Sequence, residues 1–382
     1  MQREVAIVGI GEAEAGKRSG KTAFELATEA AFLALADAGM RKDEVDALFV
    51  EHPMSAHHHM PASVMLEYLD MQPKAAVTFA NGGASPHAML MQAADLIAKG
   101  VYETILLVDA DGRSSSFSGD KAMAMYQAAG DAEEFEIPYA ATAPSRYALI
   151  AQRHMYEFGT RPEDFARLAV IERKHASLNP KAIYRDPLTV EEVLSSPMVA
   201  SPFHLLECCM VSDWGTAFIM TSKERAGKLN KKPVWIRGYG SAMQGYNLPP
   251  LSDFSSAPIQ RSSRDAFRMA GLTPEQIDVA EIYDSFPITV MLALEGIGFC
   301  EIGKSGAFVS GGAMEIGGKI PVNTHGGQLS YMCGHGQYIL EAVEQLRGEA
   351  GDRQVQGARI ALSQGTAAVC SASYTVIYEV DE

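Results

Sequence analysis

Three side chains in the C-terminal part of the chain could transfer a proton or attack a carbonyl carbon. Tyr283 ends an apolar run, and Cys333 and His335 lie two residues apart in a glycine-rich stretch. A phenol has an ordinary pKa of about 10, so Tyr283 needs a positive neighbour or several donors to act as a base, but neither to donate a hydrogen bond. Cys333 could be a general base or, paired with His335 or His325, an acyl nucleophile. The alternative for each is a packing role, which is common for free cysteines and for tyrosines at strand ends.

Other patterns that can signal a metal or a cofactor lack an essential part. We interpret His57–His59 as polar loop residues, because consecutive histidines rarely converge on one ion without carboxylate or thiolate help. The Gly9-x-Gly11 pair lacks the third glycine of a dinucleotide-binding turn, which disfavours NAD. The adjacent Cys208 and Cys209 precede an apolar run and are interpreted as core residues. The sequence therefore predicts no bound metal and no cofactor.

The elements that must position these side chains occur twice along the chain. Gly9 and Gly238 each begin a Gly-x-Gly at the end of an apolar run, and they are 229 residues apart. Each run is followed by a helical stretch and then by a second apolar run, at residues 47–50 and 279–283. Matched landmarks at a near-constant offset indicate an internal duplication.

We therefore predict two domains, an N-terminal half of residues 1–225 and a C-terminal half of residues 226–382. Alternating strand and helix patterns favour helices packed on mostly parallel sheets. Residues 111 to about 200 interrupt the N-terminal half as an inserted excursion, and such excursions often cover an active site. The methionines and tyrosines expected to contact a substrate there are Met123, Met125, Tyr126, Tyr139 and Tyr147.

Composition excludes several classes of function. The 382 residues carry a net charge of −15, which argues against a nucleic-acid or anionic-membrane partner. Five cysteines, an odd number, do not make a disulfide framework. The N-terminus lacks the basic flank and apolar core of a signal peptide, and every apolar stretch is far shorter than the ~18 residues of a membrane span. We expect a cytoplasmic protein.

Four stretches resemble motifs of the thiolase superfamily. They are Gly82-Gly83-Ala84-Ser85, Tyr283-Asp284-Ser285-Phe286, Asn323-Thr324-His325-Gly326-Gly327 and Ser363-Gln364-Gly365. The resemblance covers essentially the whole chain and is strongest to the sterol-carrier-protein-type thiolases, the acetyl-CoA acetyltransferase-like branch and the steroid side-chain aldolases. It implies an α/β thiolase fold, in which two duplicated βαβαβαββ halves form a five-layered αβαβα core with an inserted loop domain.

The departures from the family pattern bear on the chemistry. Thiolases carry their nucleophilic cysteine just before a helix, where free amides and the helix dipole favour a thiolate, but the matching residue here is Gly83. Their second acid/base cysteine falls at Ser363, whose hydroxyl is a far weaker acid. Counting without gaps puts Cys333 at the family histidine, and a two-residue slip puts His335 there. An acyl-enzyme at residue 83 is therefore excluded.

The pattern of the steroid side-chain aldolases is half met. Their first acid/base tyrosine matches Tyr283, whereas their second falls on Cys333, and the nearest tyrosine is Tyr331. The resemblance also implies that certain residues contact the substrate or hold an oxyanion. These residues are Gly83, Asn323, Gly326, Gly327, Ser363 and Gly365, with His325 and His335 as further catalytic candidates. His87, one turn into the helix after Gly83, is a weaker candidate for facing the pocket.

The resemblance implies an enzyme that acts on acyl-CoA thioesters in the degradation of lipid-like, steroid-like or aromatic acids. Because Gly83 carries no nucleophile, we favour retro-aldol cleavage of a C–C bond next to the thioester, flanked by Tyr283 and Cys333. The alternatives are an acyltransferase or thiolase with Cys333 as a displaced nucleophile, and a non-catalytic acyl-CoA-binding subunit. No cofactor is expected beyond the CoA of the substrate. The expected partners are a second copy of the chain, paired along a sheet edge as a homodimer, and a small zinc-ribbon/OB-fold protein.

Overall fold

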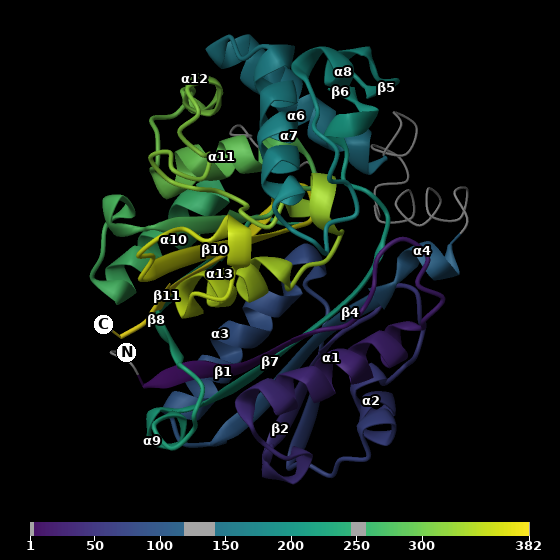
Figure 1. Ribbon diagram of the computed structural model, residues 1–382, viewed down its shortest axis with the longest axis vertical. Coiled ribbons are helices and arrows are strands. Elements are labelled where there is room, and N and C mark those ends of the chain that lie inside the picture. The colour runs from purple at the N-terminus through teal and green to yellow at the C-terminus, as the bar shows by residue number, and fades with distance from the viewer. Residues whose placement is uncertain (1–3, 118–141, 246–256, 382) are drawn as a thin grey trace.

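The structure, a computed structural model, describes residues 4–117, 142–245 and 257–381 (Figure 1). The chain first forms β1 (Val5–Glu12), α1 (Ala23–Ala38), β2 (Ala47–Glu51), α2 (Pro61–Leu69), β3 (Ala75–Phe79), α3 (Ser85–Ala98) and β4 (Thr104–Gly112). The excursion and its return contain α4 (Arg113–Ser116), α6 (Ala143–Phe158), α7 (Pro162–Ser177), α8 (Val190–Ser195), β5 (Met198–Ala200), β6 (Phe203–His204), β7 (Asp213–Ser222) and α9 (Lys223–Ala226). The rest forms β8 (Val234–Met243), α10 (Ala257–Ala270), β9 (Val279–Ile282), α11 (Pro287–Ile297), α12 (Ser305–Ser310), α13 (Gln337–Arg347), β10 (Ile360–Ala367) and β11 (Ala372–Glu379).

Among the described residues, the main sheet has nine strands in the order β3-β2-β4-β7-β1-β8-β11-β10-β9. Strands β3, β2 and β4 are parallel to one another, as are β9 and β10, but the other neighbours are antiparallel. The expectation of mostly parallel sheets is therefore wrong, because β7 and β11 return along the sheets and make each half mixed. The two halves meet where β1 pairs with β8 over two residues of each strand.

The layers follow from the alternation of apolar side chains along the strands, and they confirm the predicted five-layered fold. Ala6 and Val8 of β1 pack against α1 on one face, whereas Ile7 points to the other face. There it joins apolar residues of α3 and α13, which lie between the two halves of the sheet (Figure 1). The outer face of the C-terminal sheet is covered by α10, α11 and the helices of the excursion.

Each half uses the same device to bring a helix onto its first strand. A Cβ on Gly11 of β1 would lie 2.1 Å from the carbonyl oxygen of Ala30 in α1. A Cβ on Gly240 of β8 would lie 2.2 Å from the carbonyl oxygen of Ser262 in α10. Both Gly-x-Gly patterns therefore serve close strand–helix packing, which explains why the first of them lacks the rest of a nucleotide-binding motif.

Helices α6, α7 and α8 of the excursion lie at the end of the molecule opposite α1 and α2 (Figure 1). Of the substrate-contact candidates predicted there, Met123, Met125, Tyr126 and Tyr139 lie outside the described residues. Tyr147 is buried in α6 and donates a hydrogen bond to the carbonyl oxygen of Ala368 at 2.8 Å. In the described part of the chain, every helix is too short or too polar to cross a membrane.

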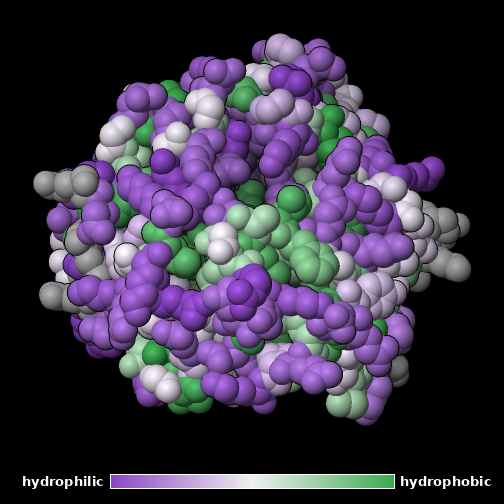
Figure 2. Space-filling model, turned by 60° about the horizontal axis from the view of Figure 1, so that its bottom comes forward, coloured by the Kyte–Doolittle hydropathy of each residue, from purple (hydrophilic) through white to green (hydrophobic). Residues whose placement is uncertain are grey.

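The end of the molecule formed by α1 and α2 exposes apolar side chains on these two helices. Phe32 and Leu33 of α1 and Tyr68 of α2 are each nearly half exposed. Figure 2, in which this end has been turned forward, shows apolar side chains gathered at the centre of the visible face and surrounded by polar ones. Patches of this kind are typical of surfaces that contact another molecule.

Candidate active site

The ring of Tyr283 fills the space next to the start of α3. Gly83 lies in the short turn that leads into α3, and Tyr283 follows the end of β9, where its N–H donates to the carbonyl oxygen of Gln364 at 3.0 Å. A Cβ on Gly83 would lie 2.5 Å from Cε2 of Tyr283 and 2.7 Å from the carbonyl oxygen of Thr366. The position expected to carry a thiolase nucleophile is thus closed by a tyrosine ring on one side and by backbone on the other.

A pair of buried carboxyl groups holds His335 from the other half of the molecule. Glu51 ends β2 and Asp109 lies in the neighbouring parallel strand β4. Nδ1 of His335 is 3.0 Å from Oε1 of Glu51. Asp109 accepts hydrogen bonds from the N–H of Gly336 at 2.6 Å and from the indole of Trp214 at 2.9 Å. Both the side chain of His335 and the backbone that follows it are therefore fixed by the N-terminal half.

Burial sets the ionisation of these groups. It raises the pKa of Glu51 to about 7, and it raises the pKa of Asp109 well above its ordinary value, with the charge of Glu51 adding to the effect. Burial also lowers the pKa of His335, and that of His87 to about 3, so both imidazoles are neutral at pH 7. Among the described residues, Glu51, Asp109 and His335 also form the one group whose ligand atoms lie within 4.8 Å of one another. Since two close carboxyl groups are satisfied by sharing one proton, we assign no metal to them.

Cys333 lies in the same loop as His335 and contacts Cys209. Its N–H donates to Oγ of Ser212 at 2.8 Å, which holds the two segments together. A hydrogen bond from the thiol of Cys209, opposed by burial, lowers the pKa of Cys333 to about 7. The same contact, together with burial, raises the pKa of Cys209 well above its ordinary value. Cys209, interpreted from the sequence as a core residue, is half-buried and lies at the candidate site.

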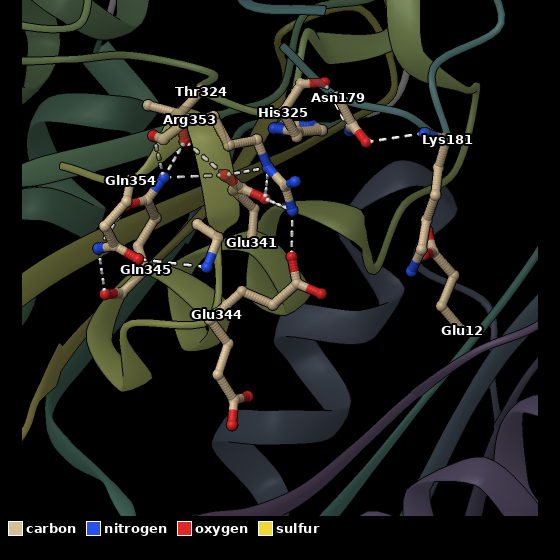
Figure 3. A network of polar contacts seen from close by, with 12 residues as sticks. Glu12, Asn179, Lys181, Thr324, His325, Glu341, Glu344, Gln345, Arg353 and Gln354 are labelled. Atoms are coloured by element: carbon tan, nitrogen blue, oxygen red, sulfur yellow. Dashed lines mark hydrogen bonds and ion pairs between the residues drawn. The ribbon is translucent and has the colours of Figure 1, made fainter.

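His325 belongs to a buried network of polar and charged groups around the start of the late glycine-rich loop and α13 (Figure 3). Its Nδ1 is 2.8 Å from Oε2 of Glu281, and its Nε2 is fully enclosed without a partner. Although burial opposes it, the hydrogen bond to Glu281 raises the pKa of His325. The hydroxyl of Thr324 donates to Glu281 or Glu341, and Arg353 pairs with Glu341 at 2.9 Å. The geometry thus ties the loop of His325 to α13 rather than opening it to a substrate.

Asn323 and the two glycines after His325 shape the turn. Asn323 is fully buried, its Oδ1 accepts from the backbone N–H at the end of β9 at 2.7 Å, and its Nδ2 donates to Glu172 at 2.8 Å. Gly326 and Gly327 have φ angles of 107° and 62°, and a Cβ on Gly327 would lie 2.2 Å from Oδ2 of Asp284. The side chain of Asn323 is therefore committed to protein groups.

Ser363 and Gly365, both in β10, lie against the side chain of His87, which comes from α3. The hydroxyl of Ser363 is 2.9 Å from Nε2 of His87 and 2.7 Å from the hydroxyl of Tyr378. A Cβ on Gly365 would lie 2.6 Å from Nδ1 of His87. This Nδ1 atom is fully buried and has no hydrogen-bond partner. His87 thus faces Ser363 and Gly365 from α3, at the inner edge of the site.

The two tyrosines near the late loop take different places. The ring of Tyr331 is buried and packs edge-on against the ring of His325, with 5.4 Å between the ring centres. The ring of Tyr338, in the first turn of α13, is 5.9 Å from that of Tyr283, and its hydroxyl donates to Oδ1 of Asp284 at 2.6 Å. Tyr338 therefore supports the segment that carries Tyr283, although the sequence motifs do not single it out.

The structure brings together part of the predicted site. Tyr283 lies beside Gly83 and beside His335, whose ring centre is 6.3 Å from its own, and Cys333 is close enough to affect the pKa of His335. The other predicted site residues shape the backbone and the buried network around these groups; they are Asn323, His325, Gly326, Gly327, Ser363 and Gly365. The sequence reasoning missed Glu51, Asp109, Cys209 and Tyr338. The first two had a usable signal, because each is a carboxylate directly after an apolar strand run, and the ends of neighbouring parallel strands share one edge of a sheet.

This arrangement can move protons near neutral pH. A thiol whose pKa is lowered to about 7 and a neutral imidazole backed by carboxyl groups lie in one loop, and a phenol beside Gly83 faces the imidazole. Such groups suit general acid–base catalysis.

Comparison with known proteins agrees with this fold. Residues 240–380 match the family described as "Thiolase C-terminal domain-like". A steroid side-chain-cleaving aldolase of Thermomonospora curvata is 34% identical over 94% of this chain and 95% of its own length. An acetyl-CoA acetyltransferase of Methanothermobacter thermautotrophicus is 34% identical over 96% of this chain and 98% of its own length. The solved structure described as "Ltp2-ChsH2(DUF35) aldolase" superimposes with a TM-score of 0.87, at 32% identity over 100% of this chain and 99% of that one. The chain therefore belongs to the thiolase superfamily and is similar to its steroid side-chain aldolases.

Proposed function

We propose that this enzyme cleaves the Cα–Cβ bond of a β-hydroxyacyl-CoA by a retro-aldol reaction. The observation that carries the proposal is the contact between Gly83 and Tyr283, which leaves neither a nucleophile nor room for one at the start of α3. A retro-aldol step needs no covalent intermediate. The similarity to a steroid side-chain-cleaving aldolase over nearly the whole chain supports the same reaction class.

The reaction needs one proton acceptor and one place for negative charge. The acceptor removes the proton of the β-hydroxyl group, the O–H electrons form the carbonyl π bond, and the Cα–Cβ bond breaks. Its electron pair moves onto the thioester as an enolate, and a proton returned to Cα gives the shortened acyl-CoA. Tyr283 is suited to donate a hydrogen bond to a substrate oxygen, Cys333 and His335 are suited to exchange the proton, and the amides near Gly83 and Gly365 are suited to hold the enolate.

The decisive experiment offers the purified chain two substrates and follows the products by mass spectrometry. A β-hydroxyacyl-CoA should give a ketone or aldehyde plus a shortened acyl-CoA without consuming free CoA. Tyr283→Phe should lose most of this activity, while keeping the fold, since only the hydroxyl is removed. CoA-dependent cleavage of a β-ketoacyl-CoA, with no cleavage of the hydroxy substrate, would overturn the proposal.

A second candidate is an acyltransferase in which Cys333 is the nucleophile. It is favoured by the pKa of Cys333, lowered to about 7, and by the similarity to an acetyl-CoA acetyltransferase. This reaction predicts an acyl group on Cys333 after incubation with acyl-CoA, detectable as an added mass that Cys333→Ala abolishes. Cys300→Ala is the matched control, because Cys300 is partly buried and belongs to another part of the core. Saturable acyl-CoA binding without turnover would favour the non-catalytic subunit instead.

We also propose two protein partners. A second copy would pair along β3, which among the described strands is bonded on one side only, to β2. A small zinc-ribbon/OB-fold protein is the other proposed partner, in keeping with the similarity to an aldolase whose solved structure is described with a DUF35 component. The substrate assays should therefore be run with and without proteins that co-purify with the chain. The cytoplasmic location expected from the sequence remains part of this proposal.

A further inference from the structure

Two carboxyl groups from the N-terminal half hold one imidazole of the C-terminal half at the candidate site. Oε1 and Oε2 of Glu51 lie 3.0 and 3.3 Å from Nδ1 of His335. Asp109 is fully buried, and its oxygens accept from Gly336, Trp214 and, at 3.3 Å, from the hydroxyl of Thr216. The pair thus controls the orientation of the ring through Glu51 and the path of the backbone through Asp109.

The backbone of this loop is closely packed at Gly336. A Cβ on Gly336 would lie 2.1 Å from Oγ1 of Thr216 and 3.1 Å from Oδ2 of Asp109. Glycine at this place therefore allows the backbone to reach the carboxyl group. Two buried carboxyl groups in contact cannot both ionise at low cost, so they share a proton and present a single negative charge to the imidazole.

Other buried histidines show what is different about His335. His154 uses both ring nitrogens, with Nδ1 2.8 Å from Thr160 and Nε2 3.1 Å from Glu295. His325 has a fully enclosed Nε2. In His335, only Nδ1 is hydrogen-bonded to a described residue, namely Glu51. Its Nε2 has no hydrogen-bond partner among the described residues and is not fully enclosed. One nitrogen is held and the other is left for a ligand.

We propose that Glu51 and Asp109 are positioning residues that keep the proton of the neutral His335 on Nδ1, so that Nε2 accepts the β-hydroxyl proton of the substrate. The second part rests on the proposed function, whereas the first concerns the ring alone. In the reaction, the O–H bond of the substrate breaks, Nε2 gains the proton, and the resulting imidazolium faces the negative charge of the carboxyl pair. The same proton is then available for Cα of the enolate, which closes the balance of the retro-aldol step.

Several other titratable groups lie close to His335. They are Asp111 at the end of β4, Arg113 at the start of α4, Cys333 in the same loop, His87 on α3 and Tyr283 after β9. Arg113 opposes protonation of the ring, whereas Asp109, Asp111 and Cys333 favour it. Removing the negative charge of the carboxyl pair takes away one of the groups that favour protonation and should therefore disfavour the imidazolium.

The test compares Glu51→Gln and the double variant Glu51→Gln/Asp109→Asn with the unaltered chain. We expect kcat for the hydroxy substrate to fall by about a hundredfold, with KM nearly unchanged. The rising limb of the rate against pH should move to lower pH by about one unit, most clearly in the double variant, because the imidazolium loses its negative partner. Glu295→Gln is the matched control, since it removes a carboxylate from a buried histidine far from the site, and it should lower stability without moving the limb.

A second readout keeps the positioning claim separate from the proposed reaction. In the unaltered chain with ¹⁵N-labelled histidine, the His335 resonances, assigned by their loss in His335→Gln, should show a protonated Nδ1 and an unprotonated Nε2 at neutral pH. Glu51→Gln should mix the two tautomers. If the tautomer is fixed but no substrate is cleaved, the proposed function fails and the positioning stands. A mixed tautomer in the unaltered chain, or an unmoved rising limb in the double variant of a working enzyme, would overturn the inference.

Discussion

Gly83 and Tyr283 compete for the same space, and this contact can be tested directly. Gly83→Cys restores the residue type that thiolases carry, but its Cβ would lie 2.5 Å from the Tyr283 ring and 2.7 Å from the carbonyl oxygen of Thr366. Because one of these neighbours is backbone, we expect a loss of stability of about 1–3 kcal/mol and no gain of thiolysis. Thermal unfolding and a CoA-release assay measure the two effects. A stable, thiolytically active Gly83→Cys would contradict the geometry.

Cys333 should ionise far below the other thiols. Its pKa is lowered to about 7 by the hydrogen bond from Cys209, whereas burial raises the pKa of Cys208, Cys300 and Cys370 to about 12. The ultraviolet absorbance of thiolate should therefore appear with a midpoint near pH 7 and vanish in Cys333→Ala. Cys209→Ala should move the midpoint upward, because the donor to the thiolate is lost. A midpoint above pH 8.5, the ordinary value for a thiol, would show that burial outweighs the hydrogen bond.

At the scale of elements, the approach of a helix to the first strand of each half depends on glycine. Gly11→Ala would place a methyl group 2.1 Å from the carbonyl oxygen of Ala30, so β1 and α1 would have to separate. We expect the free energy of unfolding to fall by about 3 kcal/mol, measured by chemical denaturation. Gly227→Ala is the control, since its φ of −66° suits alanine and the nearest atom is 3.6 Å away. It should change stability by less than about 1 kcal/mol.

The helices and strands of this architecture can largely be predicted from local sequence patterns, but the direction of the strands cannot. The capping box of Thr22 and Glu25 and the left-handed Gly39 mark the two ends of α1, and both are signals that local sequence carries. The repeat of Gly-x-Gly marks two equivalent strands because close packing selects glycine in both halves. Strand direction is different, because β7 and β8 have the apolar pattern of a buried strand whether their neighbours are parallel or antiparallel. Only the complete order of the sheet reveals that it is mixed.

The candidate site shows the same division. Tyr283, Gly83 and the late glycine-rich loop are recognisable because their motifs are continuous in sequence. Glu51 and His335 are 284 residues apart and meet only because β2 and β4 end beside the loop before α13. A carboxylate after an apolar run is also common on a solvent-exposed strand end, so its pairing with a histidine becomes visible only in three dimensions.

For the molecule as a whole, the candidate site is built from both halves of the chain. Gly83, Glu51 and Asp109 come from the N-terminal half, whereas Tyr283 and His335 come from the C-terminal half. The central helices α3 and α13 carry the turns that bring these groups together, and both pack in the apolar layer between the two halves of the sheet. Proton chemistry at this site therefore requires both halves, joined along β1 and β8.

The proposed homodimer makes the last prediction. Strand β3 ends the sheet with one side unpaired by the described strands, and Val77 on it is 38% exposed. Two such edges can pair around a twofold axis, and a substitution in an isologous contact occurs twice. Val77→Asp should place two like charges near that axis and convert the dimer to a monomer, measured by light scattering during gel filtration. Leu149→Asp, at an exposed position of α6 at the far end, is the control and should leave the dimer intact. A Val77→Asp protein that stays dimeric would move the interface away from β3.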